Sequence, residues 1–237
     1  PSIPKDELKK HCDLIIVVGG DGSLLGAARI AADQNLPVVG INRGTLGFLT
    51  DISPNRLEQL DAVLEGHYLS EERFLLEAQV HNDQGHQTPM TALNDVVLLP
   101  GDKAQMIVFD LYINEYFAYT MRADGLIVAT PTGSTAYALS GGGPILFPGL
   151  NAIVLVPLCP HILSSRPLVI TGDCQLRITI CKTNVMTPEI SCDGQRRLPV
   201  PIGTNITIKK HEHSFRLIHP INYNYYDTLR AKLHWKG

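Results

Sequence analysis

The chain has 237 residues, of which 44% are hydrophobic and 18% charged, and its formal net charge is −3. This length suits one large or two ordinary globular domains, and the slightly negative charge does not favour bulk attraction to nucleic acid. The sequence shows neither a run long enough to cross a membrane nor a signal-peptide pattern, so we expect a cytoplasmic protein. The five cysteines form no C-x-x-C pair, which favours reduced thiols over disulfides or a zinc site.

A strand, a glycine-rich turn and a helix open the chain. Asp13–Val18 is an apolar, β-branched run typical of a strand buried on both faces, and Leu24–Ala32 repeats apolar residues at helical spacing. The turn between them matches neither the Walker pattern nor the dinucleotide fingerprint. It still leaves backbone N–H groups at a helix N-terminus, where they attract phosphate, and Asp21 lies inside it. The alternative is an ordinary turn in which Asp21 or Ser23 caps the helix.

The next elements extend this pattern into a parallel α/β domain. Leu36–Ile41 is a second apolar strand, and the order strand, helix, strand predicts a βαβ unit. Asn42–Leu49 is another glycine-bearing loop, at the strand end where open α/β sheets bind ligands. A helix is expected to start at Ser53 and to end at Gly66. We therefore expect residues 1–70 to form a Rossmann-like α/β domain with a parallel sheet.

Short strands separated by Gly, Pro and Asn turns then predict a β-rich second domain at residues 71–215. Asn114-Glu115 is an expected hairpin turn, and Ser134–Leu139 is an expected short helix. Asp193-Gly194 is also a good hairpin turn, although Ser191–Gln195 could instead contact a sugar. Residues 216–237 contain an expected helix at 227–235 and are expected to return to the α/β domain. The expected strands are 74–80, 92–99, 106–113, 116–122, 126–129, 152–157, 167–170, 175–180, 189–192 and 205–209.

Two stretches of the second domain have side chains suited to a sugar or a phosphate. Thr130–Tyr137 holds five hydroxyl side chains, which suit a ribose, a phosphate or an adenine edge, although a turn held by its own hydroxyls is the alternative. Asn94 and Asp95 border an apolar strand and could hold a sugar diol, with a turn-capping pair as the alternative. The histidines are interpreted as structural, including His219 beside Pro220.

In combination these motifs closely resemble the NAD kinase family, in its proteobacterial, ATP-dependent type. The likeness covers nearly the whole chain. The glycine turn alone would be weak, because lipid kinases and phosphofructokinases carry similar turns. Asp95 departs from the pattern, since many relatives have Glu there. The matching motifs are Gly19–Gly22, Asn42–Gly44, Gly47–Leu49, Asn94-Asp95, Arg122–Gly125, Thr130–Tyr137 and Ser191–Gln195.

The resemblance implies a kinase that transfers the γ-phosphate of ATP to the 2′-hydroxyl of the adenosine ribose of NAD, giving NADP. It implies ATP and NAD as substrates, a divalent metal, for which Mg²⁺ is expected, and a homodimer or homotetramer with no nucleic-acid or membrane partner. It implies an α/β domain followed by an all-β, sandwich-like domain, with an active site between the domains that is shared with a neighbouring subunit. It also implies a strand and helix that precede Pro1, so that the sheet lacks its first elements here.

The resemblance further implies roles for individual residues. Asp21 corresponds to a general base toward the 2′-hydroxyl, or to a group that orients it. Gly20 and Gly22 would admit the donor phosphates, while Asn94 and Asp95 would hold ribose hydroxyls. No residue is assigned to the metal, and Arg122 goes with preference for NAD over NADH. Further contacts to the dinucleotide are expected from Phe48, Arg122, Asp124, Thr132, Thr135, Ala136, Tyr137, Ala138, Leu139, Ser140 and Gln195.

Two rival functions remain open from the sequence. A lipid or sugar kinase of the same superfamily would share the glycine turn, but a lipid acceptor would need an apolar pocket where Thr132–Tyr137 offers hydroxyls. A dinucleotide-binding sensor would need the binding residues without a carboxylate at position 21. The residues leave open whether ATP, another triphosphate or polyphosphate is the phosphoryl donor.

Overall fold

The computed structural model describes residues 3–44, 46–82, 85–86, 89–101 and 105–235. The chain forms two compact units. Unit 1 consists of residues 1–73 and 213–237, and unit 2 consists of residues 74–212. Two long strands, β3 (Tyr68–Asn82) and β15 (Asn205–Pro220), contribute residues to both units.

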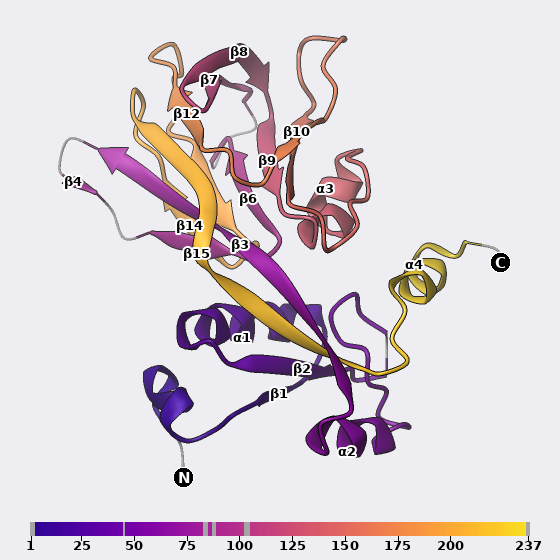
Figure 1. Ribbon diagram of the computed structural model, residues 1–237. Helices are drawn as coiled ribbons and strands as arrows, with labels where there is room; N and C mark the ends of the chain where they lie inside the picture. Colours follow the sequence, from indigo (N-terminus) through magenta and orange to yellow (C-terminus); the bar gives the residue numbers. More distant parts are fainter. Residues whose placement is uncertain (1–2, 45, 83–84, 87–88, 102–104, 236–237) are drawn as a thin grey trace. The chain divides into compact units, whose positions relative to one another are not determined.

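Unit 1 carries a parallel sheet in the order β1 (Ile15–Val18), β2 (Pro37–Ile41), β15. Leu217 of β15 lies opposite Val38 of β2. The path from β1 through helix α1 (Asp21–Gln34) to β2 is the expected βαβ unit, and Figure 1 shows α1 beside these strands. Other helical segments of this unit are η1 (Lys5–Lys10), α2 (Glu58–Leu64) and α4 (Tyr225–Leu233).

The apolar face of α1 explains why this segment is helical and where it packs. The helix ends at Asn35, whose backbone adopts the left-handed conformation (φ 51°) that asparagine tolerates. The buried side chains of α1 are Leu24, Leu25, Ala28, Ala31 and Ala32.

The expectation for β1 was wrong in one respect, because Ile16 and Val18 are 43% and 63% exposed while Val17 is buried. Successive side chains of a strand point to opposite faces, so β1 buries one face and not two.

Helix α2 is shorter than the sequence predicted. It begins at Glu58 and not at Ser53. The carbonyl of Ser53 accepts the Arg56 N–H (2.9 Å) and its hydroxyl accepts the Asn55 N–H (3.3 Å), so a turn precedes the helix. Gly66, with φ of 92°, follows the end of the helix as predicted.

Unit 2 is made of two antiparallel sheets, which confirms the expected all-β second domain. One sheet has the order β11-β10-β9-β6-β13-β14. In the other, β15-β12-β7-β8 are neighbours and β3 pairs with β15, β4 and β5. Apolar side chains from both sheets, including Leu98, Phe109 and Ile178, form one buried cluster. The strands are β4 (Gly85–His86), β5 (Met90–Ala92), β6 (Asp95–Leu99), β7 (Ile107–Ile113), β8 (Tyr116–Ala123), β9 (Gly125–Ala129), β10 (Ala152–Leu158), β11 (Leu168–Thr171), β12 (Leu176–Ile180), β13 (Glu189–Cys192) and β14 (Arg196–Pro199).

Both predicted hairpin turns are confirmed. Asn114 and Glu115 have φ of 49° and 65° between β7 and β8, and Asp193 and Gly194 have φ of 51° and 65° between β13 and β14. Positive φ at both central residues is what a two-residue hairpin turn of the primed type requires. The sequence signal was strong because Asn, Asp and Gly tolerate that conformation best.

The expected helix at 134–139 is divided into η2 (Gly133–Thr135) and α3 (Tyr137–Ser140). Figure 1 shows α3 beside β9 and β10. Ala138 of α3 is fully buried against apolar residues of these strands, which fixes the short helix on the sheet. Over the described ranges, no helix has the length and apolar content needed to cross a membrane.

Strand β15 is much longer than the predicted 205–209. Its middle, from Lys209 to His213, is polar and mostly exposed, whereas Phe215, Leu217 and Ile218 near its end are buried. The polar run is typical of a loop when only the sequence is considered. Pairing with β12 at one end and with β2 at the other holds the whole segment extended.

Candidate functional site

The glycine-rich turn of unit 1 places Asp21 at the first position of α1. Gly20 is the N-cap in an extended conformation and no side chain caps the helix, so neither Asp21 nor Ser23 is a cap. Instead, the Asp21 carboxylate accepts the backbone N–H groups of Phe48 (2.9 Å) and Leu49 (3.0 Å). One bond goes to each oxygen, so each oxygen keeps a lone pair for a further donor.

Tight packing between the two glycine-bearing loops fixes this carboxylate. A Cβ atom on Gly47 would collide with the side chains of Asp21 and Thr50. Gly20 and Gly22, in contrast, are exposed and have open space where a side chain would begin. The carboxylate is therefore anchored, while the backbone beside it is accessible to a phosphate at the helix N-terminus.

The loop that holds Asp21 is itself ordered by local bonds. Asn42 is buried, and its side-chain oxygen accepts the N–H of Gly44 (2.9 Å), whose φ of 100° requires glycine. Phe48 is half-buried, and Lys232 Nζ of α4 lies 5.6 Å from the centre of its ring. Lys232 was not predicted from the sequence, because only the tertiary fold brings it close to Phe48.

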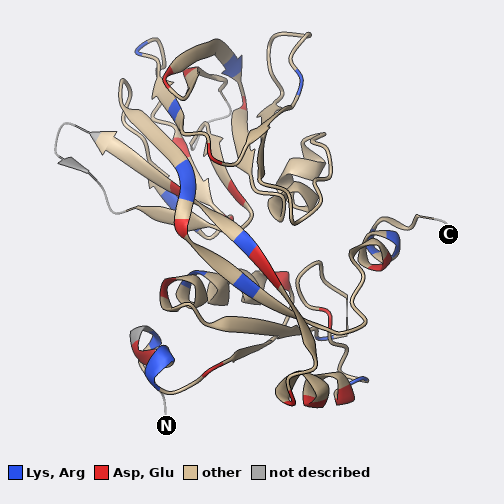
Figure 2. Cartoon of the chain, viewed as in Figure 1, with Lys and Arg blue, Asp and Glu red and all other residues tan. Residues whose placement is uncertain are grey.

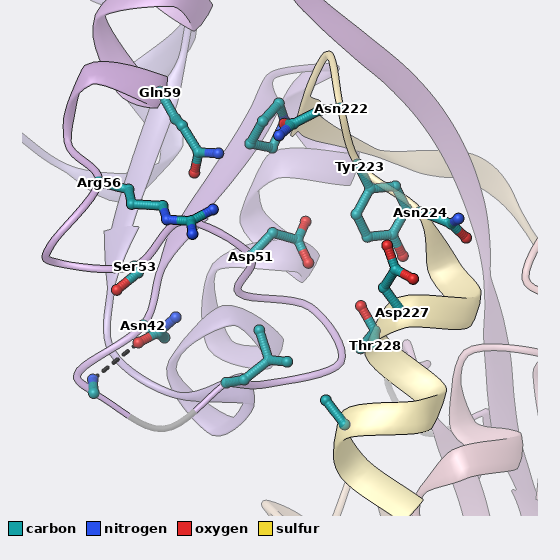
Figure 3. Close-up of a pocket in the computed structure, with 14 residues that line it drawn as sticks. Asn42, Asp51, Ser53, Arg56, Gln59, Asn222, Tyr223, Asn224, Asp227 and Thr228 are labelled. Atoms are coloured by element: carbon teal, nitrogen blue, oxygen red, sulfur yellow. Dashed lines mark hydrogen bonds between the residues drawn. The ribbon is translucent and has the colours of Figure 1, made fainter. Parts of the chain in front are cut away.

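A polar cavity of about 470 Å³ lies in unit 1 at the carboxyl ends of β2 and β15. Figure 3 shows the Asp51 carboxylate directed into it from one wall, with Tyr223 and Thr228 on the C-terminal segment across from it. The Oδ1 atom of Asp51 and the Tyr223 hydroxyl are buried without a hydrogen-bond partner among the described residues. The loop that begins at Asn42, which the sequence placed at a ligand-binding edge of the sheet, lines one part of this cavity, whereas the contribution of the C-terminal segment was not predicted.

Behind the cavity, His219 lies between two carboxylates. Its Nδ1 contacts Asp51 and its Nε2 contacts Glu71 (3.0 Å), and Arg73 pairs with Glu71 (2.8 Å). Burial acts to lower the pKa of His219, but the hydrogen bonds to both carboxylates outweigh it and raise that pKa. Burial likewise acts to raise the pKa of Glu71, which the bonds to His219 and Arg73 hold below its usual value. The predicted structural role of His219 is confirmed.

Unit 2 has its own cavity of about 510 Å³, which brings several predicted residues together. Asn94 and Asp95, at the start of β6, share it with Ala136 and Tyr137 from the η2–α3 segment. Asp193 also lines this cavity, from the stretch that the sequence left open between a turn and a sugar contact, whereas Arg197, on β14, was not predicted. The full lining is Asn94, Asp95, Val97, Leu99, Ala136, Tyr137, Ser191, Asp193, Gly194 and Arg197.

The hydroxyl-rich stretch is partly the self-bonded turn that the alternative interpretation predicted. The Ser134 hydroxyl donates to the Pro131 carbonyl (2.6 Å), and the Thr135 hydroxyl donates to the Thr132 carbonyl (3.1 Å). Thr130 accepts the N–H of residue 133 on its hydroxyl oxygen (3.1 Å). These hydroxyls shape the backbone, and the cavity is lined here by Ala136 and Tyr137 instead.

Other predicted contact residues lie outside this cavity. Arg122 and Asp124 are exposed at the junction of β8 and β9, and Gln195 is exposed in the β13–β14 turn. Ala138 packs in the core, while Thr132 is buried. Leu139 is half-buried and Ser140 is exposed on α3.

Asp95 has an unusual electrostatic environment. The residue is only 5% exposed, and burial, with a smaller contribution from the charge of Asp193, raises the pKa of Asp95 to about 7. Perturbed carboxyl groups of this kind in a cavity are typical of functional sites. Over the described ranges there is no cluster of three or more His, Cys, Asp or Glu side chains that could hold a metal ion.

Comparison with known proteins gives a consistent result for both parts of the chain. Residues 4–68 match the family model described as ATP-NAD kinase N-terminal domain, and residues 93–220 match the ATP-NAD kinase C-terminal domain. A NAD kinase of Coxiella burnetii is 57% identical over 235 residues, which cover 99% of this chain and 79% of that protein. A NAD kinase of Pseudomonas putida is 57% identical over 229 residues, which cover 96% of this chain and 77% of that protein.

Solved structures show the same likeness. A yeast NADH kinase complexed with NADH superimposes with a TM-score of 0.86 at 29% identity, covering 96% of this chain and 67% of that one. A NAD kinase from Archaeoglobus fulgidus in complex with ATP has a TM-score of 0.78 at 31% identity, and the match covers 99% of this chain and 87% of that one.

Proposed function

The chain belongs to the NAD kinase family, and on this basis we propose which residues carry out each part of the reaction. The enzyme transfers the γ-phosphate of ATP to the 2′-hydroxyl of the adenosine ribose of NAD, giving NADP and ADP. A bond forms between the 2′-oxygen and the γ-phosphorus, and the bond from that phosphorus to the β,γ-bridging oxygen breaks. The proton of the hydroxyl must leave as the new bond forms, and the charge on the phosphoryl oxygens must be neutralised.

Asp21 orients the 2′-hydroxyl and accepts its proton. The observation that carries this proposal is the two-point anchoring of the carboxylate by the N–H groups of Phe48 and Leu49. A fixed carboxylate with one remaining lone pair on each oxygen can hold a hydroxyl at a set distance, which is how positioning lowers a barrier. The accessible glycine backbone beside it, at Gly20 and Gly22, binds the donor phosphates.

The acceptor dinucleotide is held mainly by unit 2. Asn94 and Asp95 hold its ribose hydroxyls, and the neighbouring Ala136 and Tyr137 line the same cavity. Phe48 of unit 1 flanks the adenine. The proposal keeps the expected contact residues outside the cavity. Arg122, Asp124, Ser140 and Gln195 are exposed, Leu139 is half-buried, and Thr132 and Thr135 shape the turn beside the cavity.

A divalent cation, Mg²⁺, enters with ATP. The described residues offer no cluster of ligand side chains, which suits an ion bound largely by phosphate oxygens and water, with Asp21 as the nearby carboxylate. When bound, Mg²⁺ supplies charge neutralisation on the phosphates. Removal of the metal by EDTA should abolish NADP formation, and added Mg²⁺ should restore it.

The enzyme is proposed to be a cytoplasmic homodimer or homotetramer without a nucleic-acid or membrane partner. The five cysteines are free thiols, as expected in a reducing compartment. Figure 2 shows acidic and basic residues alternating along β3 and β15, with no separation of charge between them. On the edge strand β8, Tyr116 and Phe117 are 80% and 58% exposed, which favours a subunit contact. Light scattering after gel filtration tests the assembly.

The decisive experiment follows NADP formation from NAD, ATP and Mg²⁺ with an NADP-specific dehydrogenase. Asp21→Asn should retain NAD binding and lose turnover by about 10²- to 10³-fold, because the amide cannot accept the proton. Asp33→Asn, an exposed carboxylate on the same helix, is the matched control and should stay fully active. Undiminished turnover in Asp21→Asn would refute the assigned role, and absence of NADP with the parent enzyme would refute the reaction.

A further inference from the structure

One carboxylate holds the backbone segment that carries Asn94 and Asp95. The oxygens of Asp193 accept the backbone N–H groups of Leu93 (3.0 Å), Asn94 (2.8 Å) and Asp95 (3.2 Å). The N–H of Asp193 in turn donates to the carbonyl of Asp95 (3.0 Å). Hydrogen bonds to an ionised acceptor are roughly twice as strong as neutral ones. Asp193 therefore fixes three consecutive amides that lie about 100 residues earlier in the chain.

The opposite side of the same segment is also held. The N–H of Thr130 donates to the carbonyl of Asn94 (2.9 Å), and its hydroxyl donates to the carbonyl of Leu93 (2.6 Å). A side chain on Gly133 would collide with the backbone of Asn94. With amides and carbonyls both engaged, the side chains of Asn94 and Asp95 are what the segment presents to the cavity.

The hairpin turn by itself does not require this carboxylate. Asp193 and Gly194 both have positive φ, and the N–H of Gln195 donates to the carbonyl of Cys192 (3.0 Å) to close the turn. Asn or Gly would serve this conformation as well as Asp does. An acid at position 193 has a use beyond the turn, because only an acid can accept all three amides with full charge.

We propose that Asp193 is a positioning residue of the kinase reaction, which acts through its three amide contacts to set where Asn94 and Asp95 hold the acceptor ribose. The inference rests on the proposed contact of Asn94 and Asp95 with that ribose. Asp193 itself need not touch the substrate.

The charge of Asp193 gives this role a signature that a purely structural residue would lack. It contributes, after burial, to the raised pKa of Asp95 of about 7. The other charged or titratable groups that line the same cavity are Arg197 and Tyr137. An ionised Asp95 accepts a ribose hydroxyl hydrogen, so NAD binding should weaken as the pH falls through 7. Without the charge of Asp193, the pKa of Asp95 should be lower, so the weakening of NAD binding should begin at a lower pH.

The test is Asp193→Asn, which keeps the turn and the volume but places an NH₂ group against the N–H of Leu93. We expect KM for NAD to rise about tenfold, with KM for ATP and kcat within twofold of the parent. The acid limb of kcat/KM for NAD should move to lower pH. Asp193→Glu keeps the charge and should leave the acid limb at the pH of the parent enzyme. This variant provides the pH comparison if Asp193→Asn is poorly folded. Asp173→Asn, an exposed carboxylate bonded to Asn151, is the matched control.

Asn94→Ala and Asp95→Asn separate this inference from the function on which it rests. If both raise KM for NAD while Asp193→Asn leaves KM and the pH profile unchanged, the positioning role is overturned and the ribose contact stands. If neither raises KM for NAD, the ribose contact fails, and the positioning role falls with it.

Discussion

Removal of the imidazole of His219 tests whether the buried charges of unit 1 stabilise the fold. His219 is 1% exposed and contacts Asp51, whose side chain is 9% exposed, as well as Glu71. In His219→Ala, Glu71 keeps Arg73 as its partner, whereas Asp51 loses the one ion-pair partner that the described structure gives it. The variant therefore leaves a buried carboxylate uncompensated.

The expected loss follows from that uncompensated charge. Breaking a buried ion pair by removal of one partner costs about 3–5 kcal/mol of unfolding free energy. The stacked contact of His219 with Tyr223, whose ring centres lie 3.8 Å apart, adds a smaller loss. For a chain of this length, each kcal/mol lowers Tm by about 2–4 °C, so Tm should fall by roughly 6–20 °C.

The pH dependence gives a second, independent check. The pKa of His219 is raised in the folded state, so its stabilisation is complete below its usual value of 6.5 and is lost as the pH rises through the folded pKa. The pKa of Glu71 is lowered, so its stabilisation is present above its usual value of 4.5 and is lost as the pH falls through the folded pKa. The difference in unfolding free energy between parent and variant should therefore be greatest between pH 4.5 and 6.5.

The assay is urea unfolding followed by circular dichroism at pH 5.5 and pH 9, with Tm measured in parallel. His67→Ala is the control, because His67 is exposed and its 3.8 Å pair with Glu65 should contribute little. A loss below about 1 kcal/mol at pH 5.5 in His219→Ala, or the same loss at both pH values, would refute the reasoning.

Two glycine substitutions give further tests. Gly47→Ala should lower kcat at least tenfold with little change in KM for ATP, because the new methyl group displaces the Asp21 carboxylate from its anchoring amides; steady-state kinetics measure this, and parental kcat would contradict it. Gly26→Ala should raise the unfolding free energy by about 0.5–1 kcal/mol without changing kcat, because the site is helical and open; a lower Tm would contradict it.

The sequence predicted those parts of the structure that depend on local signals. Continuous apolar runs located β1 and β2, helical spacing of apolar residues located α1, and the pair Asp193-Gly194 identified its hairpin. The length of β15 could not be predicted, because the polar run from Lys209 to His213 is extended only through pairing with distant strands. Local propensity carries no information about such pairing.

The candidate site was likewise predicted only in part. Asp21, Asn94 and Asp95 were identified as residues, but their hydrogen-bond partners were not. Asp21 takes its amides from a loop 27 and 28 residues further along, and Asp193 reaches back about 100 residues. The sequence left Ser191–Gln195 open between a turn and a sugar contact. The bonds of Asp193 to the amides of residues 93–95 could not be predicted, because they exist only once β13 pairs with the distant strand β6.

The path of β15 has a consequence for how the protein is made on the ribosome. Strand β2 ends at Ile41 and acquires its partner Leu217 only after a further 176 residues, 42–217, have been synthesised. At about 5–20 residues per second, the parallel edge of β2 waits roughly 9–35 seconds for that partner. Unit 2, unlike unit 1, is one continuous segment of the chain, residues 74–212. An exposed apolar strand edge is a template for wrong pairing, so this interval is when β2 is most open to pairing with the wrong strand.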